Sequence, residues 1–385
     1  MSAQQLIQPR ERALQLQQYL QHDPHNAHLL GELATLHLQL GEFNRALELI
    51  NQALDSAPQD TTLQFDKATI AMAAGFPEEA VAIYELLQSQ GVDSAILRFN
   101  YAYACLYLRQ YARARKLLES VPGDDPQLPE YQLLYARVLH RLGDLEPALA
   151  LLHTYVGQHP ENAQAAGELA MLAVDNSHNA DGEKWARQAL ILNPNQLEAL
   201  IALGTMAFEQ DQETEARLYY DKAVSAAPRS GRALSGLGLV EMMSDNVKGA
   251  KDCFTKAVKT MPDHIGTWHA LGWCQLLGDD MEGARVSFNR SMELNHNFSE
   301  THGALAVIDI FEGRLPPAES KIKKSLRLDP ANFSGLFAQS LLAQSQGDMQ
   351  TARKITREIL LMVQPHSGKK LKALLAQLLQ GEKGI

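Results

Sequence analysis

Residues 199–228, ALIALGTMAFEQDQETEARLYYDKAVSAAP, and residues 268–296, WHALGWCQLLGDDMEGARVSFNRSMELNH, show the pattern that decides the fold. Each stretch holds two apolar runs at helical spacing, separated by a short polar turn. Large residues such as Leu203 and Tyr220 are placed to fill the space between the two helices of the first stretch. Each stretch therefore predicts a helical hairpin.

The hairpin recurs along the chain with a fixed period. Eight prolines are separated by 34 residues or by a multiple of 34, and ten consecutive units of this length run from Ala27 to His366. These prolines are Pro24, Pro58, Pro126, Pro160, Pro194, Pro228, Pro262 and Pro330. A length of 385 residues alone would suggest two or three ordinary domains, but the period predicts a repeat architecture instead.

Two positions of the unit hold only small residues. The eighth is always Ala, Gly or Ser and the twentieth is always Ala or Gly, as in Ala34 and Ala46. Two helices approach closely only where the side chains at their crossing are small, so these positions mark the contact inside each hairpin. Between them lie residues typical of the left-handed conformation that ends a helix. They are Gly41, Gly75, Gly143, Asp211, Asp245, Asp279, Gly313 and Gly347.

A 34-residue hairpin with these small positions and a closing LNP or LDP resembles the tetratricopeptide repeat, over about nine-tenths of the chain. The resemblance implies an all-α fold, a right-handed α-α superhelix or solenoid of stacked hairpins. We expect residues 1–26 to form an N-terminal capping helix, 27–366 one continuous solenoid, and 367–385 a C-terminal capping helix and tail. The apolar stripe of residues 369–380 could instead dock on a partner or a membrane.

The resemblance also implies that the first helices form a concave inner wall, lined by the second, fifth, ninth and twelfth positions of each unit. These positions are markedly apolar, which is typical of a surface that binds partners. The alternative is that these side chains pack between neighbouring first helices. The candidate groove residues are Phe65, Phe99, Tyr103, Leu106, Arg137, Met171, Ile201, Phe208, Leu239, Met242, His269, Trp273 and Phe337.

Family members that grip the acidic tails of heat-shock chaperones use lysine and asparagine at these positions. The first units hold Gly31 with Thr35, Phe65 with Thr69, and Phe99 with Tyr103 instead. We therefore expect no such tail-binding role.

Composition limits the partners and the compartment. The net charge of −10 disfavours nucleic acid as a partner, although the part from Arg314 onward carries 12 Lys/Arg against 5 Asp/Glu. That end could dock an acidic partner or could simply be a solvated helix face. No long apolar segment predicts a membrane span, and three cysteines without paired spacing favour a reducing, cytoplasmic location. The sequence does not decide the oligomeric state.

No motif of an enzyme or of a cofactor site is found, so we expect neither catalysis nor a cofactor. His22, His25 and His28 lack the spacing of a metal site, and Cys105 and Cys274 fit packing better than nucleophilic chemistry.

His269 and His302 could form a polar pair at a binding surface or could be ordinary packing residues. The sequence thus favours a scaffold or adaptor that binds apolar or amphipathic segments of proteins. The alternatives are a chaperone for an exported or membrane-inserting client and a peptide-sensing regulator.

Overall fold

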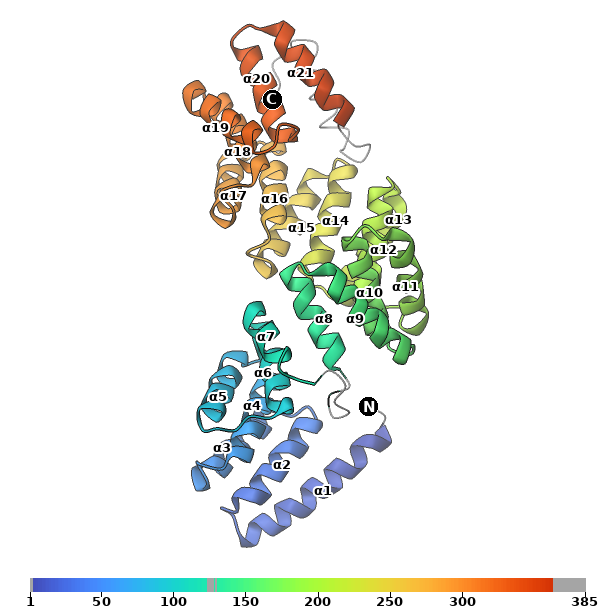
Figure 1. Ribbon diagram of the computed structural model, residues 1–385, viewed down its shortest axis with the longest axis vertical. Helices are drawn as coiled ribbons and strands as arrows, with labels where there is room; N and C mark the ends of the chain where they lie inside the picture. Colours follow the sequence, from blue (N-terminus) through green and yellow to red (C-terminus); the bar gives the residue numbers. More distant parts are fainter. Residues whose placement is uncertain (1–2, 123–127, 129, 363–385) are drawn as a thin grey trace. The chain divides into compact units, whose positions relative to one another are not determined.

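The computed structural model describes residues 3–122, 128 and 130–362, and the regular structure of these residues is helical throughout (Figure 1). Clustering of contacts divides the chain into unit 1, residues 1–159, and unit 2, residues 160–385. The helices of unit 1 are α1 (Ala3–His22), α2 (Ala27–Gln39), α3 (Phe43–Ser56), α4 (Thr61–Ala74), α5 (Pro77–Ser89), α6 (Ala95–Tyr107), α7 (Tyr111–Leu118), α8 (Tyr131–Leu142) and α9 (Leu145–Gln158).

Unit 2 continues the same alternation of helices. Its members are α10 (Ala163–Asp175), α11 (Asn179–Leu192), α12 (Leu197–Glu209), α13 (Glu213–Ala226), α14 (Gly231–Met243), α15 (Val247–Thr260), α16 (Ile265–Leu277), α17 (Met281–Leu294), α18 (Ser299–Phe311), α19 (Leu315–Leu328), α20 (Phe333–Ser345) and α21 (Met349–Met362). From α2 onward, an even label marks the first helix of a hairpin and an odd label the second.

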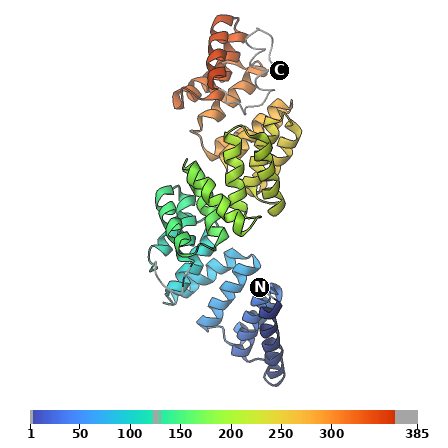
Figure 2. The ribbon, with the colours of Figure 1, turned by 90° about the vertical axis from the view of Figure 1, so that its right-hand side faces the viewer.

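Within each unit every helix packs on the next one along the chain, so that the hairpins stack in order (Figure 2). First helices of neighbouring hairpins also contact one another. Helix α2 contacts α4 in unit 1, and helix α10 contacts α12 in unit 2. The prediction of an all-α solenoid of stacked hairpins is confirmed. One continuous solenoid over residues 27–366 stays a prediction, and the expected C-terminal cap lies outside the described residues.

Helix boundaries follow from capping and turn chemistry. The side chains of Asn26, Asp60 and Asn162 accept hydrogen bonds from backbone N–H groups in the first turns of α2, α4 and α10. At the turns, all eight glycines and aspartates predicted to be left-handed have positive φ, including Asp211 and Asp245 at 58°. The small residues of each unit lie where helices pack closely, since Ala34 and Ala46, for example, are fully buried.

The capping helix α1 lies inside the expected range of residues 1–26 and packs on α2, but another element differs from the expected pattern. Helix α7 is only 8 residues long and ends at Leu118. Pro122 disfavours helical backbone at Val121, so the helix cannot extend past this point.

Candidate binding surfaces on the first helices

The thirteen predicted groove residues separate into three groups by exposure. Met171, Ile201 and Phe337 are buried, with Phe337 fully so, and they belong to the core rather than to an accessible wall. Leu239 is exposed at 36%. The other nine are half-buried, namely Phe65, Phe99, Tyr103, Leu106, Arg137, Phe208, Met242, His269 and Trp273.

In unit 1 three of the predicted groove residues, together with Tyr107, lie on one face of α6. Phe99 is followed by Tyr103, Leu106 and Tyr107 at spacings of four, seven and eight residues, so the four side chains share a face of the helix. The rings of Tyr103 and Tyr107 lie 5.3 Å apart, and Tyr107 is 61% exposed. We call these four residues the unit 1 aromatic patch. Tyr107 was missed in the sequence, although its spacing of four from Tyr103 was a usable signal.

Phe99, Tyr103 and Leu106 pack against the core of unit 1, which contains a row of aromatic rings. Tyr84 packs between Phe65, at 6.0 Å, and Tyr101, at 5.7 Å. Burial raises the pKa of Tyr84 to about 12, and burial together with the neighbouring hydroxyl of Tyr107 raises the pKa of Tyr103 to about 12. The phenols therefore stay neutral, and the patch offers ring faces and hydroxyl groups rather than charge.

In unit 2 an ion pair links two first helices that are not neighbours. Arg232, at the start of α14, binds Asp175, at the end of α10, through two hydrogen bonds of 3.1 and 2.7 Å. This contact bypasses α12, the first helix between them.

Accessible apolar side chains lie on the same helices. Leu239, Met242 and Met243 are spaced three and four residues apart on α14, and Phe208 holds the position equivalent to Met242 on α12. Leu239 is exposed and the others are half-buried. These four residues are called the unit 2 apolar patch, and the methionines give it the adaptable shape of a surface that fits varied partners.

Trp273 belongs to a third, more enclosed group. Its ring contacts Phe288 at 6.0 Å, Phe333 at 5.7 Å and Phe337 at 5.9 Å. The indole N–H donates to Nε2 of His269 at 3.0 Å, so the proton of this imidazole resides on Nδ1. Burial lowers the pKa of His269 to about 3, so the ring is neutral. Both side chains therefore serve mainly as internal packing.

For His269 and His302 the alternatives were a polar pair and ordinary packing. His302 is buried, and its Nε2 lies 2.8 Å from the backbone oxygen of His296, while His269 binds Trp273. Each histidine thus has its own partner, and the interpretation as packing residues fits the contacts better.

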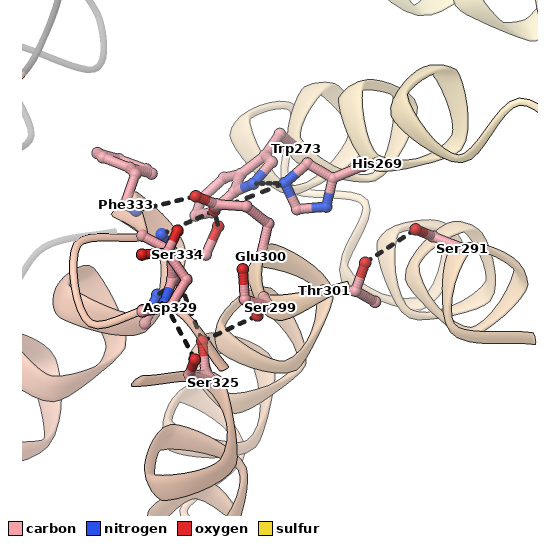
Figure 3. Close-up of polar contacts among 12 residues, drawn as sticks. His269, Trp273, Ser291, Ser299, Glu300, Thr301, Ser325, Asp329, Phe333 and Ser334 are labelled. Carbon is pink, nitrogen blue, oxygen red and sulfur yellow. Dashed lines mark hydrogen bonds and ion pairs between the residues drawn. The ribbon is translucent and has the colours of Figure 1, made fainter. Parts of the chain in front are cut away.

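Glu300 links two hairpins beside this group, and sequence reasoning did not identify it. Figure 3 shows its carboxylate pointing at the start of α20, where it accepts hydrogen bonds of 2.9 Å from the backbone N–H groups of Phe333 and Ser334. It also accepts one from the hydroxyl of Ser334. A carboxylate on helix α18 therefore caps helix α20, which fixes the two first helices against each other.

The basic side chains near the C-terminal end lie on second helices. Lys321 pairs with Asp309, Lys323 pairs with Glu319 at 2.8 Å, and Arg353, Lys354 and Arg357 are exposed on α21. An acidic partner for this face stays a prediction.

The cysteines show no sign of activation. Cys105 and Cys274 are fully buried, and burial raises the pKa of Cys105 to about 11. A thiol with such a pKa remains protonated near neutral pH, so it is a poor nucleophile.

These features define the class of protein, a helical-repeat solenoid with apolar patches on its first helices. Family models described as "Tetratricopeptide repeat" match residues 13–68, 71–138 and 167–231. The chain belongs to the tetratricopeptide-repeat family.

Comparison with individual proteins agrees with this family and fold. "Tetratricopeptide repeat protein 8" of Caenorhabditis elegans is 24% identical over 152 residues, which are 39% of this chain and 30% of that protein. The match thus spans under a third of that relative.

Among solved structures, "Human IFIT1 dimer with PPP-AAAA" is similar with a TM-score of 0.53 at 18% identity, covering 88% of this chain and 90% of that one. The human IFIT1 dimer with m7Gppp-AAAA gives 0.53 at 16% identity, covering 94% and 95%. At these identities the likeness concerns the fold alone. None of the helices in the described ranges is both long and apolar enough to cross a membrane.

Proposed function

We propose that this protein is a non-catalytic scaffold or adaptor that binds apolar or amphipathic segments of partner proteins along its first helices. One observation carries the proposal. Large apolar side chains on first helices stay accessible in both units, with Tyr107 at 61% and Leu239 at 36% exposure. Accessible apolar groups gathered on one face are typical of protein docking sites, and stacked helical repeats commonly use their concave face for binding.

The two patches suit different segments. The unit 1 aromatic patch offers two tyrosine rings, tilted by 56° to each other, beside the cationic side chain of Arg137. The unit 2 apolar patch offers flexible methionines and a leucine. A cytoplasmic location fits the cysteine chemistry and the acidic composition, and we include it in the proposal.

The test compares two patch variants with a matched outer-face control in affinity co-purification. One variant carries Tyr103→Asp and Tyr107→Asp, and the other carries Leu239→Asp and Met242→Asp. The control is Ile191→Asp on the second helix α11, where the side chain is 83% exposed. Circular dichroism would check that all variants keep their helicity.

We expect partners recovered with the wild type and with the control to be lost from at least one patch variant. Equal recovery with all four proteins would refute the proposal. Release of the partner during washing, against retention in a stable assembly, would separate a client-releasing chaperone from a scaffold.

A further inference from the structure

The second helices α19 and α21 carry an excess of positive charge. Together they hold seven lysines and arginines against two glutamates. Helices α11 and α17 hold two cationic and two acidic side chains each, and α13 holds two cationic and three acidic ones. Second helices elsewhere in unit 2 thus meet the solvent with charges of both signs, so solvation alone does not account for the excess on α19 and α21.

Three of these cations have no partner in the fold. Arg327, Lys354 and Arg357 are exposed, and within the described part of the chain none of them makes an ion pair or a side-chain hydrogen bond. By contrast, Lys321 pairs with the buried Asp309, and so has a use in the fold. The packing of unit 2 therefore leaves three positive charges available on these two helices.

Exposed leucines accompany these cations at the ends of both helices. Leu328, the last residue of α19, is 37% exposed, and Leu361, one residue before the end of α21, is 89% exposed. On α21, Lys354 is followed by Arg357 and Leu361 at spacings of three and seven residues, so these three side chains share a face of the helix. Cations and an accessible leucine therefore point the same way.

The two helices are close enough to act together. Both pack on the first helix α20 (Figure 1), and packed helix axes lie roughly 8–10 Å apart, so the axes of α19 and α21 are at most about 20 Å apart. Both are second helices of successive hairpins, so they run in the same direction. We call the exposed side chains of this area the basic outer face. Its residues are Arg327, Leu328, Lys354, Arg357 and Leu361.

The shape of this face indicates what binds to it. Leu361 protrudes from the surface, so a rigid partner would need a recess to receive it, whereas a fluid lipid layer deforms around it. Surfaces that mix leucine with lysine and arginine bury the leucine at the boundary of headgroups and acyl chains, and their cations attract anionic headgroups.

We infer that the basic outer face binds an anionic lipid surface, with the two leucines inserted and the three cations at the headgroups. This binding goes beyond the proposed function, which concerns the first helices. The net charge of −10 does not prevent the contact, because charges farther from the lipid than about 8 Å are largely screened at physiological salt.

The test measures how the full chain partitions onto two kinds of lipid vesicle, at low and at physiological salt. One kind is phosphatidylcholine alone, and the other contains about one third phosphatidylserine, which is anionic. Co-sedimentation gives the partition coefficient of each. The key variant carries Arg327→Gln, Lys354→Gln and Arg357→Gln, and circular dichroism would check that it stays helical.

Two further triple variants serve as comparisons. The matched control removes three exposed cations from the second helix α15. Its substitutions are Lys248→Gln, Lys256→Gln and Lys259→Gln. The tail variant removes three lysines that lie beyond the described residues. Its substitutions are Lys369→Gln, Lys370→Gln and Lys372→Gln.

We expect the wild type to bind the phosphatidylserine vesicles roughly tenfold more strongly than those of phosphatidylcholine alone, with binding falling as salt rises. The key variant should lose roughly tenfold of this binding, because each cation near an anionic surface adds to the attraction. The control and the tail variant should each lose less than about twofold. Leu361→Ser should lower binding about fivefold, since serine cannot replace the inserted leucine.

Four results would overturn the inference. Equal binding to both vesicles would mean that charge does not select the surface. An equal loss with the control would show an effect of overall charge, and a larger loss with the tail variant would place the contact in residues 369–372. If vesicles are not bound but a soluble peptide of leucine and glutamate binds and is lost with the key variant, the partner is an acidic protein segment. Co-purification with the patch variants decides the proposed function independently of all four.

Discussion

His269 is a neutral imidazole enclosed by aromatic rings, with Phe288 and Phe298 each 5.4 Å away. Burial lowers its pKa from the usual 6.5 to about 3. Burial also lowers the pKa of His302. In the unfolded state a histidine is protonated near pH 6.5, whereas in the folded state these buried histidines are protonated only at lower pH. The stability that their neutral rings contribute is therefore complete above pH 6.5. It falls as the pH drops from 6.5 toward 3.

Unit 2 should therefore lose stability on mild acidification. We expect His269 to account for up to about 2 kcal/mol of lost unfolding free energy between pH 7.5 and pH 5.0. Urea unfolding at the two pH values measures this loss. Tryptophan fluorescence reports on unit 2 alone, because all three tryptophans, Trp185, Trp268 and Trp273, belong to it.

The variant His269→Gln tests whether His269 causes this loss of unfolding free energy. It should shrink the difference between the two pH values, whereas His178→Gln, at an exposed histidine of the same unit, should leave it unchanged. A difference that is the same in the wild type and in His269→Gln would mean that this residue does not carry the pH dependence.

Left-handed residues show how far single positions could be predicted. The glycines and aspartates at the turns were identified from residue type, but Arg109 and Ser177, with φ of 58° and 61°, were not. Neither type favours this conformation. At Ser177 two backbone hydrogen bonds that close the helix end impose the left-handed conformation. The N–H of His178 donates to the oxygen of Ala173, and the N–H of Ser177 donates to the oxygen of Val174. The hairpin geometry overrides the local preference.

At the scale of elements, glycine sets how closely two first helices approach. Gly31, Gly167 and Gly303 occupy the fifth position in every fourth unit. A Cβ on Gly303 would lie 2.3 Å from the backbone nitrogen of Gly335, on the neighbouring first helix α20. Helices α18 and α20 therefore pack backbone against backbone, an arrangement that the cap from Glu300 reinforces.

Adding one methyl group should have opposite effects at two glycines. Gly303→Ala should lower the free energy of unfolding by about 2–3 kcal/mol, because backbone atoms would have to move. Gly157→Ala, inside α9 with nothing within 4 Å of the added carbon, should raise it by about 0.5–1 kcal/mol. Urea unfolding followed by far-ultraviolet circular dichroism measures both. A stabilised Gly303→Ala would show that α18 and α20 lie farther apart than described.

Asp309 ties three helices together through charge. Its buried carboxylate binds Arg314 at 2.6 Å and Lys321, both on or next to α19, and lies 3.5 Å from Arg285 on α17. Removing one member of a buried ionic group leaves the others without compensation. Asp309→Ala should therefore lower the unfolding free energy of unit 2 by about 3 kcal/mol, measured by tryptophan fluorescence in urea.

An exposed pair in the same region supplies the contrast. Glu319 binds Lys323 one turn away on the surface of α19. Glu319→Gln should leave the unfolding free energy nearly unchanged, because solvent screens such pairs. If the two substitutions prove equally mild, the Asp309 network contributes little to stability.

At the scale of the whole molecule, the period of 34 residues predicted the hairpins but could not predict which wall side chains stay accessible. Met171 and Leu239 hold the same position of the unit, yet Met171 is buried and Leu239 exposed. Such differences depend on three-dimensional packing, as at Gly167, where the missing Cβ leaves room for the side chain of Gln196. Nor could the period predict that unit 1 ends at His159, since both sides of this boundary repeat the same pattern.

Charge is the whole-molecule property that bears on nucleic acid. The human IFIT1 structures of similar fold contain PPP-AAAA or m7Gppp-AAAA. Binding of phosphates depends on lysine and arginine that release counterions, and this chain has a net charge of −10. Its exposed cations are largely on second helices such as α21, beside Glu358, and the turns of α12 to α17 are acidic.

We therefore expect no saturable binding of fluorescently labelled PPP-AAAA at protein concentrations up to about 100 μM in physiological salt, measured by anisotropy. Weak attraction at low salt should vanish as salt rises, since it would involve few phosphate contacts. The decisive comparison is with the variant that carries Arg137→Glu and Arg141→Glu. Both arginines lie on α8, which is the first helix of its hairpin. Micromolar binding that these substitutions abolish would show that α8 holds phosphates, and the exclusion of nucleic acid drawn from net charge would then be wrong.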